Sequence, residues 1–316
     1  MKREQFITDV AGVDIGKLRL DVAFARSEDH QSIANRPEAF PALIAWLHEH
    51  GVHRVGMEAS GNYERDVRDA LEAAGFEVVV HQPQEIKAYA RFRRVLAKSD
   101  KMDARVIAQA TQHWEGVVAR RDPALVELAE MLTLYEFLSG KVAEAKTLAE
   151  HQRLTEVKAL NTETIRHLLQ QKQKILVKVL QRLRARPDLR QRFELLQSLP
   201  GIGPVIAAVL VVRMPELGSL QHGQAASLLG VAPFDRDSGM MAGKRFIKGG
   251  RQRPRDFVYL AALAAKRWGS HFKIFADRLI ANGKLPKVAI VAVMRKLIEA
   301  ANLILKRQTP WIHAKT

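Results

Sequence analysis

The sequence predicts an amino-terminal α/β domain built on a mixed sheet, followed by a carboxy-terminal region made of helices. Two observations predict this division. The first hundred residues alternate between short strand-like segments and helical periodicity, with glycines at the helix ends. Beyond Asp122 the sequence becomes rich in Leu, Ala, Glu and Lys, and residues 125–158 are nearly free of Gly and Pro. These features are typical of long helices.

Three short strands are predicted first. Residues 10–15 form an apolar run, residues 18–24 alternate between apolar and polar side chains, and residues 31–35 fit a third strand. Gly16 and Lys17 suit a tight hairpin connection between the first two strands. Strands joined by such short turns predict an antiparallel meander.

The later strands alternate with helices. Helices are predicted at residues 37–51, 62–75 and 99–114, the last with Ser99 as its N-cap, and strands at residues 52–58 and 76–82. This alternation predicts parallel additions to the same sheet. The order β-β-β-α-β-α-β-α is that of the ribonuclease H-like fold, to which RuvC-type nucleases belong.

The helical region contains a heptad pattern whose members are spaced 4-3-4-3-4: Ile165, Leu169, Lys172, Leu176, Val179 and Leu183. It fits a helix packed on its own domain as well as an intermolecular coiled coil. Pro187 marks a boundary beyond which the chain stays helical. We therefore expect a catalytic domain at 1–124, long helices at 125–190 and a carboxy-terminal domain at 191–316.

Charge points to the class of partner. The 316-residue chain carries 50 Lys and Arg against 34 Asp and Glu, a formal charge of +16. A folded chain this basic usually binds a polyanion, of which nucleic acid is the first candidate. No apolar run is long enough for a membrane span and no secretory signal precedes the first strand. With no cysteine either, we expect a cytoplasmic protein.

Four carboxylates are candidates for a metal site. Asp14 lies in the first predicted strand, Glu58 ends the fourth, and Asp100 and Asp103 share one face of a helix. In the fold predicted above they converge, and divalent cations offset their repulsion. Oxygen ligands favour Mg²⁺ or Mn²⁺, which can support phosphoryl transfer. Singly, each has a structural alternative; Asp100, for example, could complement its helix dipole.

The stretch LPGIGP at residues 199–204 lies between two helical segments and matches a helix-hairpin-helix element. Gly201 and Gly203 permit a tight turn whose backbone amides can contact phosphate without reading bases. The alternative is an ordinary glycine turn between packed helices. The pattern indicates a partner class and no reaction.

The stretch DRDSG contains Ser238 and precedes twelve residues, 244–255, that carry six basic side chains. No neighbouring histidine suggests a hydrolase triad. We expect five of these side chains to hold nucleic-acid phosphate: Lys244, Arg245, Lys248, Arg251 and Arg253. From chemistry alone, Ser238 is better explained as a turn residue, or as a hydroxyl that donates a hydrogen bond to phosphate, than as a nucleophile.

Together these stretches resemble a known family. GVDIGK, GMEASGNYE, KSDKMDARVIA, LPGIGP and GVAPFDRDSG followed by GKRFIKGGR are similar to successive signatures of the DEDD insertion-sequence transposases, the insertion-sequence "one-ten" family, whose members include bridge-RNA-guided recombinases. The resemblance implies a RuvC-like catalytic domain and a helical transposase domain. It implies an acidic tetrad of Asp14, Glu58, Asp100 and Asp103 that holds Mg²⁺.

The resemblance also implies the chemistry and the partners. Ser238 would attack a DNA phosphodiester and form a 5′-phosphoserine link, so the protein would be a DNA transposase or recombinase. The catalytic sites would be composites of two subunits, in dimers that pair into a tetramer. A noncoding bridge RNA would pair with donor and target DNA.

Two other functions remain open from the residues. A RuvC-like structure-selective nuclease would use metal-activated water and leave no protein–DNA adduct. An architectural or RNA-binding protein would not need divalent metal. The four carboxylates argue against the second, because they would repel a nucleic-acid ligand for no benefit.

Overall fold

A computed structural model describes residues 10–95, 100–116, 122–234, 245–268 and 270–312, with backbone alone at residues 100, 101 and 270. The chain divides into two compact units, residues 1–120 and 121–316. The long helices that we expected at 125–190 are therefore part of the second unit.

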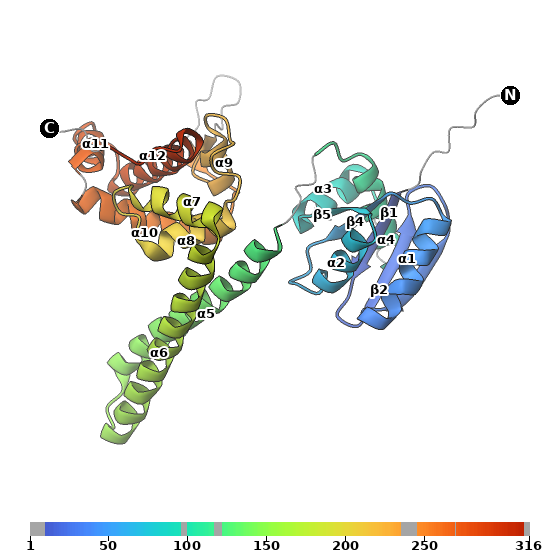
Figure 1. Ribbon diagram of the computed structural model, residues 1–316, viewed down its shortest axis with the longest axis horizontal. Helices are drawn as coiled ribbons and strands as arrows, with labels where there is room; N and C mark the ends of the chain where they lie inside the picture. Colours follow the sequence, from blue (N-terminus) through green and yellow to red (C-terminus); the bar gives the residue numbers. More distant parts are fainter. Residues whose placement is uncertain (1–9, 96–99, 117–121, 235–244, 269, 313–316) are drawn as a thin grey trace. The chain divides into compact units, whose positions relative to one another are not determined.

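The first unit is built on a mixed five-stranded sheet in the order β3-β2-β1-β4-β5 (Figure 1). The strands β1 and β2 are antiparallel, as are β2 and β3, whereas β4 is parallel to both β1 and β5. This topology confirms the predicted α/β class with an antiparallel meander and parallel additions. The strands are β1 (Val10–Ile15), β2 (Arg19–Phe24), β3 (His30–Ala34), β4 (Arg54–Glu58) and β5 (Glu77–His81).

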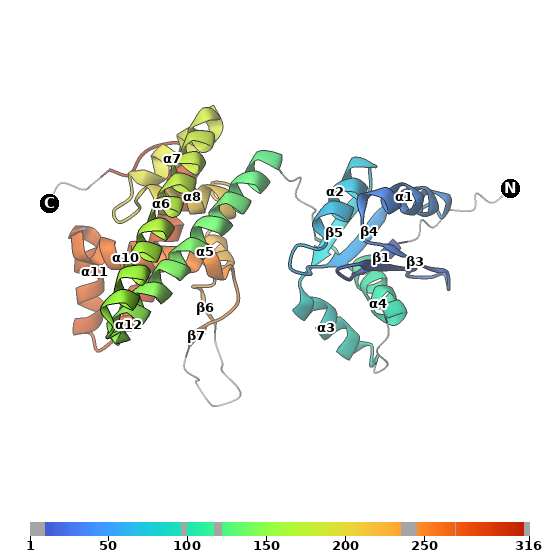
Figure 2. The same cartoon turned by 90° about the horizontal axis from the view of Figure 1, so that it is seen from below.

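Helices cover both faces of this sheet, α1 and α2 on one face and α3 and α4 on the other (Figure 2). Their bounds are α1 (Phe40–Glu49), α2 (Arg65–Ala73), α3 (Pro83–Phe92) and α4 (Asp100–Gln112), and a 3-10 turn (Pro37–Ala39) precedes α1. Ser99, the predicted N-cap of α4, lies outside the described residues.

The helix α3 was missed by the sequence analysis, which had no element between β5 and the last helix of this unit. Pro83 occupies its first turn, where a missing N–H costs nothing. Gln82 and Glu85 form a capping box, in which the backbone N–H of Gln82 donates to Glu85 Oε2 at 2.9 Å. Proline followed two residues later by glutamate was the overlooked start signal.

The core of the first unit lies between the sheet and the helices α1 and α2. Alternate strand residues point into it, among them Ala11 and Val13 on β1 and Val55 and Met57 on β4. The residues between them, including Asp14 and Glu58, therefore face the side covered by α4.

Two glycines let α4 pack directly on the sheet. Gly12 and Gly56 are paired neighbours on β1 and β4. A methyl group at Gly12 would overlap the backbone of Ala104 and Ala108, and one at Gly56 would overlap the Thr111 side chain. Because neither glycine carries a side chain, α4 lies close against the centre of the sheet from Ala104 to Thr111.

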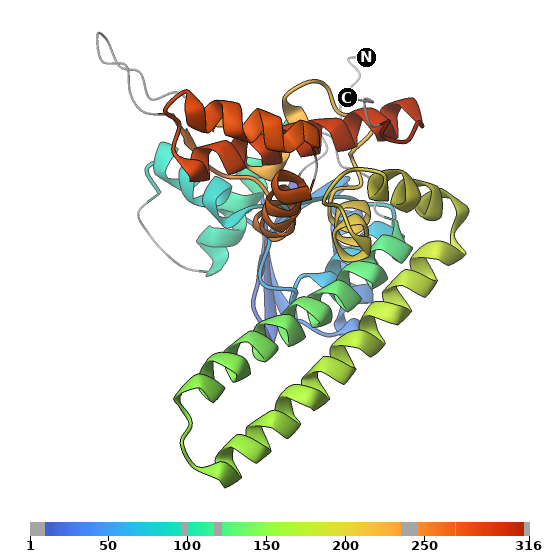
Figure 3. The same ribbon diagram turned by 90° about the vertical axis from the view of Figure 1, so that its left-hand side faces the viewer.

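The second unit is helical. Its two longest helices, α5 (Pro123–His151) and α6 (Thr155–Ala185), run side by side as an antiparallel hairpin (Figure 3). The other elements are α7 (Pro187–Gln197), α8 (Pro204–Arg213), α9 (Gln224–Leu229), the short strands β6 (Pro233–Phe234) and β7 (Phe246–Ile247), α10 (Gln252–Trp268), α11 (Ser270–Ala281) and α12 (Pro286–Arg307). Among the described helices, none combines the length and apolarity that a membrane span needs.

The predicted heptad of α6 is used within the unit over its second half. Val179 and Leu183 are fully buried in the same core as Leu128 and Leu132 of α5. Nearer the hairpin tip, Leu169 is 42% exposed. Packing within its own unit therefore accounts for the carboxy-terminal part of the heptad pattern, at Val179 and Leu183. For the part around Leu169, an intermolecular coiled coil stays a prediction.

We predict that Gly56→Ala and Gly12→Ala each lower the free energy of unfolding of the first unit by about 2–3 kcal/mol, because the added methyl group pushes α4 off the sheet. Thermal or urea unfolding of the full chain measures this. Gly140→Ala is the control, since an added methyl group within α5 meets no neighbour. It should be neutral or stabilising by about 0.5–1 kcal/mol, and an equal loss in all three variants would contradict the explanation.

Candidate active site

Polar side chains form a row across the sheet on the face that α4 covers. The register pairs Asp14 with Asp21 on β2, and it pairs Glu58 with His81 on β5. The parallel pairing of Val13 with Met57, extended by one residue, sets Asp14 beside Glu58. Two of the predicted tetrad members therefore lie next to each other, on the central strands of the sheet.

Asp103 joins them from above the sheet. It lies in the first turn of α4, one residue before the point where Ala104 meets Gly12. Burial raises the pKa of Glu58, the Lys87 ammonium opposes this rise, and the Asp103 carboxylate adds to it. This coupling means that Asp103 is close enough to Glu58 for the two negative charges to repel.

Asp100, the fourth predicted member, opens α4, and its side chain lies outside the described residues. Among the side chains that the structure does describe, no three metal-ligating groups already stand at coordination distance. The donor set nevertheless fits a hard divalent cation. It consists of carboxylate oxygens, and a cation would favour the ionised form of Glu58, whose pKa is raised mainly by burial and further by Asp103.

Glu64 stabilises the loop that follows Glu58. It is only 7% exposed. Its Oε2 accepts hydrogen bonds from the backbone N–H of Ser60 at 3.2 Å, the Ser60 hydroxyl at 3.0 Å and the backbone N–H of Asn62 at 3.0 Å. Burial alone would raise the pKa of Glu64, yet these bonds hold it below its ordinary value. The Ser-Gly-Asn turn was the signal that the sequence analysis overlooked.

His81 connects β5 to α4 and was also missed. Its ring is buried, and Nε2 lies 2.8 Å from Thr111 Oγ1. The Thr111 hydroxyl donates to the Ile107 carbonyl at 2.7 Å, so it accepts from His81. Burial lowers the pKa of His81, although nearby Glu85 opposes this effect. The lowered pKa keeps the ring neutral at pH 7. This bond fixes α4 over the same edge of the sheet as Glu58.

In the second unit, the two glycines of the turn between α7 and α8 differ in backbone conformation and in packing. Gly201 has a φ of 83° and packs against the backbone of Ala261 and Ala265 in α10, so the fold requires glycine there. Gly203 is exposed and precedes α8 with a φ of −83°, and a side chain there would meet nothing. The fold leaves Gly203 open to the approach of a ligand.

Ser238 and Lys244 lie outside the described residues, within 235–244. The chain on either side is fixed. The ribbon of β6 and β7 pairs Phe234 with Phe246. Beyond it the backbones of Gly230, Gly249 and Gly250 pack so closely that a methyl group would overlap at Gly230 or Gly250. These contacts set where the segment that contains Ser238 begins and ends.

The basic residues that follow differ in their surroundings. Arg245 and Lys248 are exposed. Arg251 makes two hydrogen bonds to Glu216, at 2.6 and 2.8 Å, and one to the Arg213 carbonyl at 2.7 Å. Hydrogen bonds therefore occupy the guanidinium of Arg251, which we expected to contact nucleic acid, within its own unit.

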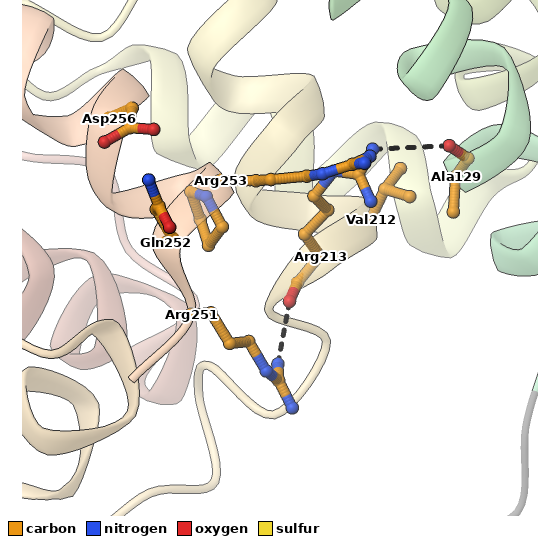
Figure 4. Close-up of a pocket in the computed structure, with 8 residues that line it drawn as sticks. Ala129, Val212, Arg213, Arg251, Gln252, Arg253 and Asp256 are labelled. Atoms are coloured by element: carbon orange, nitrogen blue, oxygen red, sulfur yellow. Dashed lines mark hydrogen bonds between the residues drawn. The ribbon is translucent and has the colours of Figure 1, made fainter. Parts of the chain in front are cut away.

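Arg253 lines a pocket of about 670 Å³ together with Arg213 and Arg251 (Figure 4). The carboxylate of Glu136 lies between two of these arginines, 2.9 Å from Arg213 and 3.1 Å from Arg253. Burial lowers the pKa of Arg213, and Glu136 opposes that effect. One carboxylate thus holds two guanidinium groups from α8 and α10 at the pocket.

Comparisons with known proteins agree with this organisation. A family model described as "Transposase" matches residues 11–157, and one described as "Transposase IS116/IS110/IS902 family" matches residues 193–277. The pilin gene-inverting proteins of Moraxella bovis and Moraxella lacunata are each 26% identical over 320 residues, across 95% of this chain and 96% of theirs. A solved structure, T. thermophilus RuvC in complex with Holliday junction substrate, is 18% identical, with a TM-score of 0.27 over 33% of this chain and 91% of that one.

An acidic row on the mixed sheet of the first unit, a basic helical second unit and a transposase match to each of them define an enzyme that cleaves and rejoins DNA. The chain belongs to the IS110 family of insertion-sequence transposases.

We predict that Glu58→Gln raises the thermal stability of the metal-free protein at pH 7. The raised pKa means that ionised Glu58 destabilises the folded state. This penalty grows as pH rises from the ordinary pKa of 4.5 to the folded pKa, and it is constant above that. Unfolding in EDTA at several pH values measures it. The gain should shrink below the ordinary value of 4.5, where wild-type Glu58 is neutral in both states. A gain that persists unchanged at low pH would contradict this explanation.

Proposed function

We propose that this transposase exchanges DNA strands through a covalent serine intermediate, with Mg²⁺ or Mn²⁺ held by Asp14, Glu58, Asp100 and Asp103. The observation that carries the proposal is the convergence of Asp14, Glu58 and Asp103 on one face of the sheet in a chain of this family. The basic segment around Ser238 supplies the second half of the chemistry.

The proposed step forms one bond and breaks one. Ser238 Oγ attacks a DNA phosphorus and gives its proton to a general base, while the bond from phosphorus to the 3′-oxygen breaks and that oxygen takes up a proton from a general acid. The products are a 5′-phosphoserine and a free 3′-hydroxyl. Attack by the 3′-hydroxyl of another strand reverses these changes, so rejoining needs no external energy source. A divalent cation, when bound, stabilises the attacking and leaving oxygens.

The chain's own residues prepare this step. Packing of α4 on Gly12 and Gly56 holds Asp103 over Glu58, and Glu64 orders the loop next to it. Arg255 Nη1 donates to the Gly249 carbonyl at 2.6 Å, which fixes one end of the serine segment. The DNA phosphates are held by Lys244, Arg245 and Lys248. Ion pairs with Glu216 and Glu136 hold Arg251 and Arg253 in place beside this segment.

We further propose that a noncoding bridge RNA pairs with donor and target DNA and so selects the sites. Base pairing would supply the specificity, leaving the protein to bind phosphate, which suits its charge of +16. The active form would be dimers that pair into a tetramer, with composite sites, in the cytoplasm. The pilin gene-inverting relatives support a role in DNA rearrangement.

A second function is favoured by one observation. The described carboxylates lie together within the first unit, whereas Ser238 belongs to the second. A metal-dependent, RuvC-like nuclease could therefore use water as its nucleophile. It would release 5′-phosphate ends without any protein–DNA adduct.

Ser238→Ala should abolish both the adduct and strand exchange while nucleic-acid affinity stays within about twofold, because the change removes the nucleophile and no charge. Protein, flanking RNA, donor and target duplexes and Mg²⁺ are mixed, and DNA-linked peptides are identified by mass spectrometry after denaturation. Ser227→Ala, at an exposed serine of α9, is the control and should retain activity. Retained exchange in Ser238→Ala would refute the serine role, and cleavage without an adduct would favour the nuclease.

The two glycines of the helix-hairpin-helix turn make a second test. Gly203→Ala should leave the melting temperature within about one degree, because its φ is ordinary and its surroundings are open. It should weaken DNA binding several-fold if phosphate approaches this backbone. Gly201→Ala should instead lower the melting temperature. DNA affinity unchanged in Gly203→Ala would refute phosphate binding at this turn.

A further inference from the structure

Asp21, at the middle of β2, is a carboxylate that the proposed mechanism does not use. Its side chain is only 7% exposed. It is paired directly with Asp14 across the two antiparallel strands. Directly opposed side chains on such strands have Cβ atoms about 5 Å apart, and like charges there are destabilising. A buried aspartate at this position therefore needs an explanation.

The surroundings of Asp21 are arranged asymmetrically. His30 Nε2, from β3, lies 3.3 Å from Asp21 Oδ1, and Arg19 Nε lies 3.5 Å from Oδ2. Arg19 also donates to Ser32, which is the partner of Asp21 on β3. Both basic groups come from β2 and β3, so they hold the Asp21 carboxylate from the side away from Glu58.

The row across the sheet thus has a direction. It begins with the basic side chains on β2 and β3, continues through Asp21 and Asp14, and reaches Glu58, over which Asp103 is held. Repulsion from Asp21 disfavours orientations in which the Asp14 carboxylate leans toward β2. Asp14 is thereby directed toward the side where Glu58 and Asp103 lie.

We propose that Asp21 is a positioning residue for the divalent-cation site. Its carboxylate directs Asp14 toward Glu58 and adds negative potential beside the cation, while Arg19 and His30 hold it in place. This inference rests on the proposed metal site at Asp14, Glu58, Asp100 and Asp103. The alternative is that Asp21 only ties β2 to β3 through its two basic partners, in which case its loss changes stability and leaves cation binding alone.

The test measures Mn²⁺ binding to the full-length protein without nucleic acid. The electron paramagnetic resonance signal of free Mn²⁺ reports how much of the ion remains unbound. Asp21→Asn keeps the size of the side chain and removes its charge, and it should weaken Mn²⁺ affinity about tenfold, as is typical for residues that orient metal ligands. Asp69→Asn, on an exposed carboxylate of α2 and so on the other face of the sheet, is the matched control and should bind as wild type. Circular dichroism establishes that each variant is folded.

The Asp14→Asn variant distinguishes failure of this inference from failure of the proposed metal site. It should remove the Mn²⁺ site, and wild-type affinity in that variant would refute the proposed metal site itself. If Asp14→Asn loses binding but Asp21→Asn binds Mn²⁺ as wild type and merely melts at a lower temperature, Asp21 is a structural residue and the inference is wrong. Should Asp21→Asn fail to fold, the smaller Asp21→Ser takes its place and is judged by the same two outcomes.

Discussion

The close packing of α4 on the centre of the sheet is the constraint on which the acidic site depends. Gly12 and Gly56 lie side by side on the two central strands, and each lacks the side chain that would keep a helix at the usual distance. Because Ala104 rests directly on Gly12, the preceding residue, Asp103, is brought to the carboxylates of the strands. The hydrogen bond between His81 and Thr111 holds the same helix from the edge of the sheet.

This packing concentrates negative charge, and the surrounding residues manage that charge in different ways. Burial and Asp103 together raise the pKa of Glu58. Glu64, one loop away, is stabilised by backbone and hydroxyl donors and contributes order to the loop. Asp21 is held by Arg19 and His30. The central carboxylates, Asp14, Glu58 and Asp103, form a set of oxygen donors that suits a hard divalent cation.

The second unit fixes the chain on either side of the segment that contains Ser238. Close packing of three glycine backbones and the bond from Arg255 to Gly249 fix its base. Ion pairs with Glu216 and Glu136 then hold Arg251 and Arg253 in defined positions. The carboxylates partly offset the positive charge of these two arginines. Arg245 and Lys248 remain on the exposed side. Basic residues adjacent in sequence thus fall into supporting and exposed groups.

The sequence by itself determined the strands of the mixed sheet and the long helices, because periodicity and strand ends are local properties. It also named Asp14 and Glu58 as candidates, and the strand register sets them side by side. It did not reveal α3, or that Asp21 and Glu64 are buried. Burial of an acid depends on partners far along the chain, such as His30 for Asp21, and on turn geometry such as that around Asn62. Likewise, only packing against α10 separates Gly201, which the fold requires, from Gly203, which it leaves open. Charge and spacing are written in the sequence, whereas which charge is already paired is decided by the tertiary contacts.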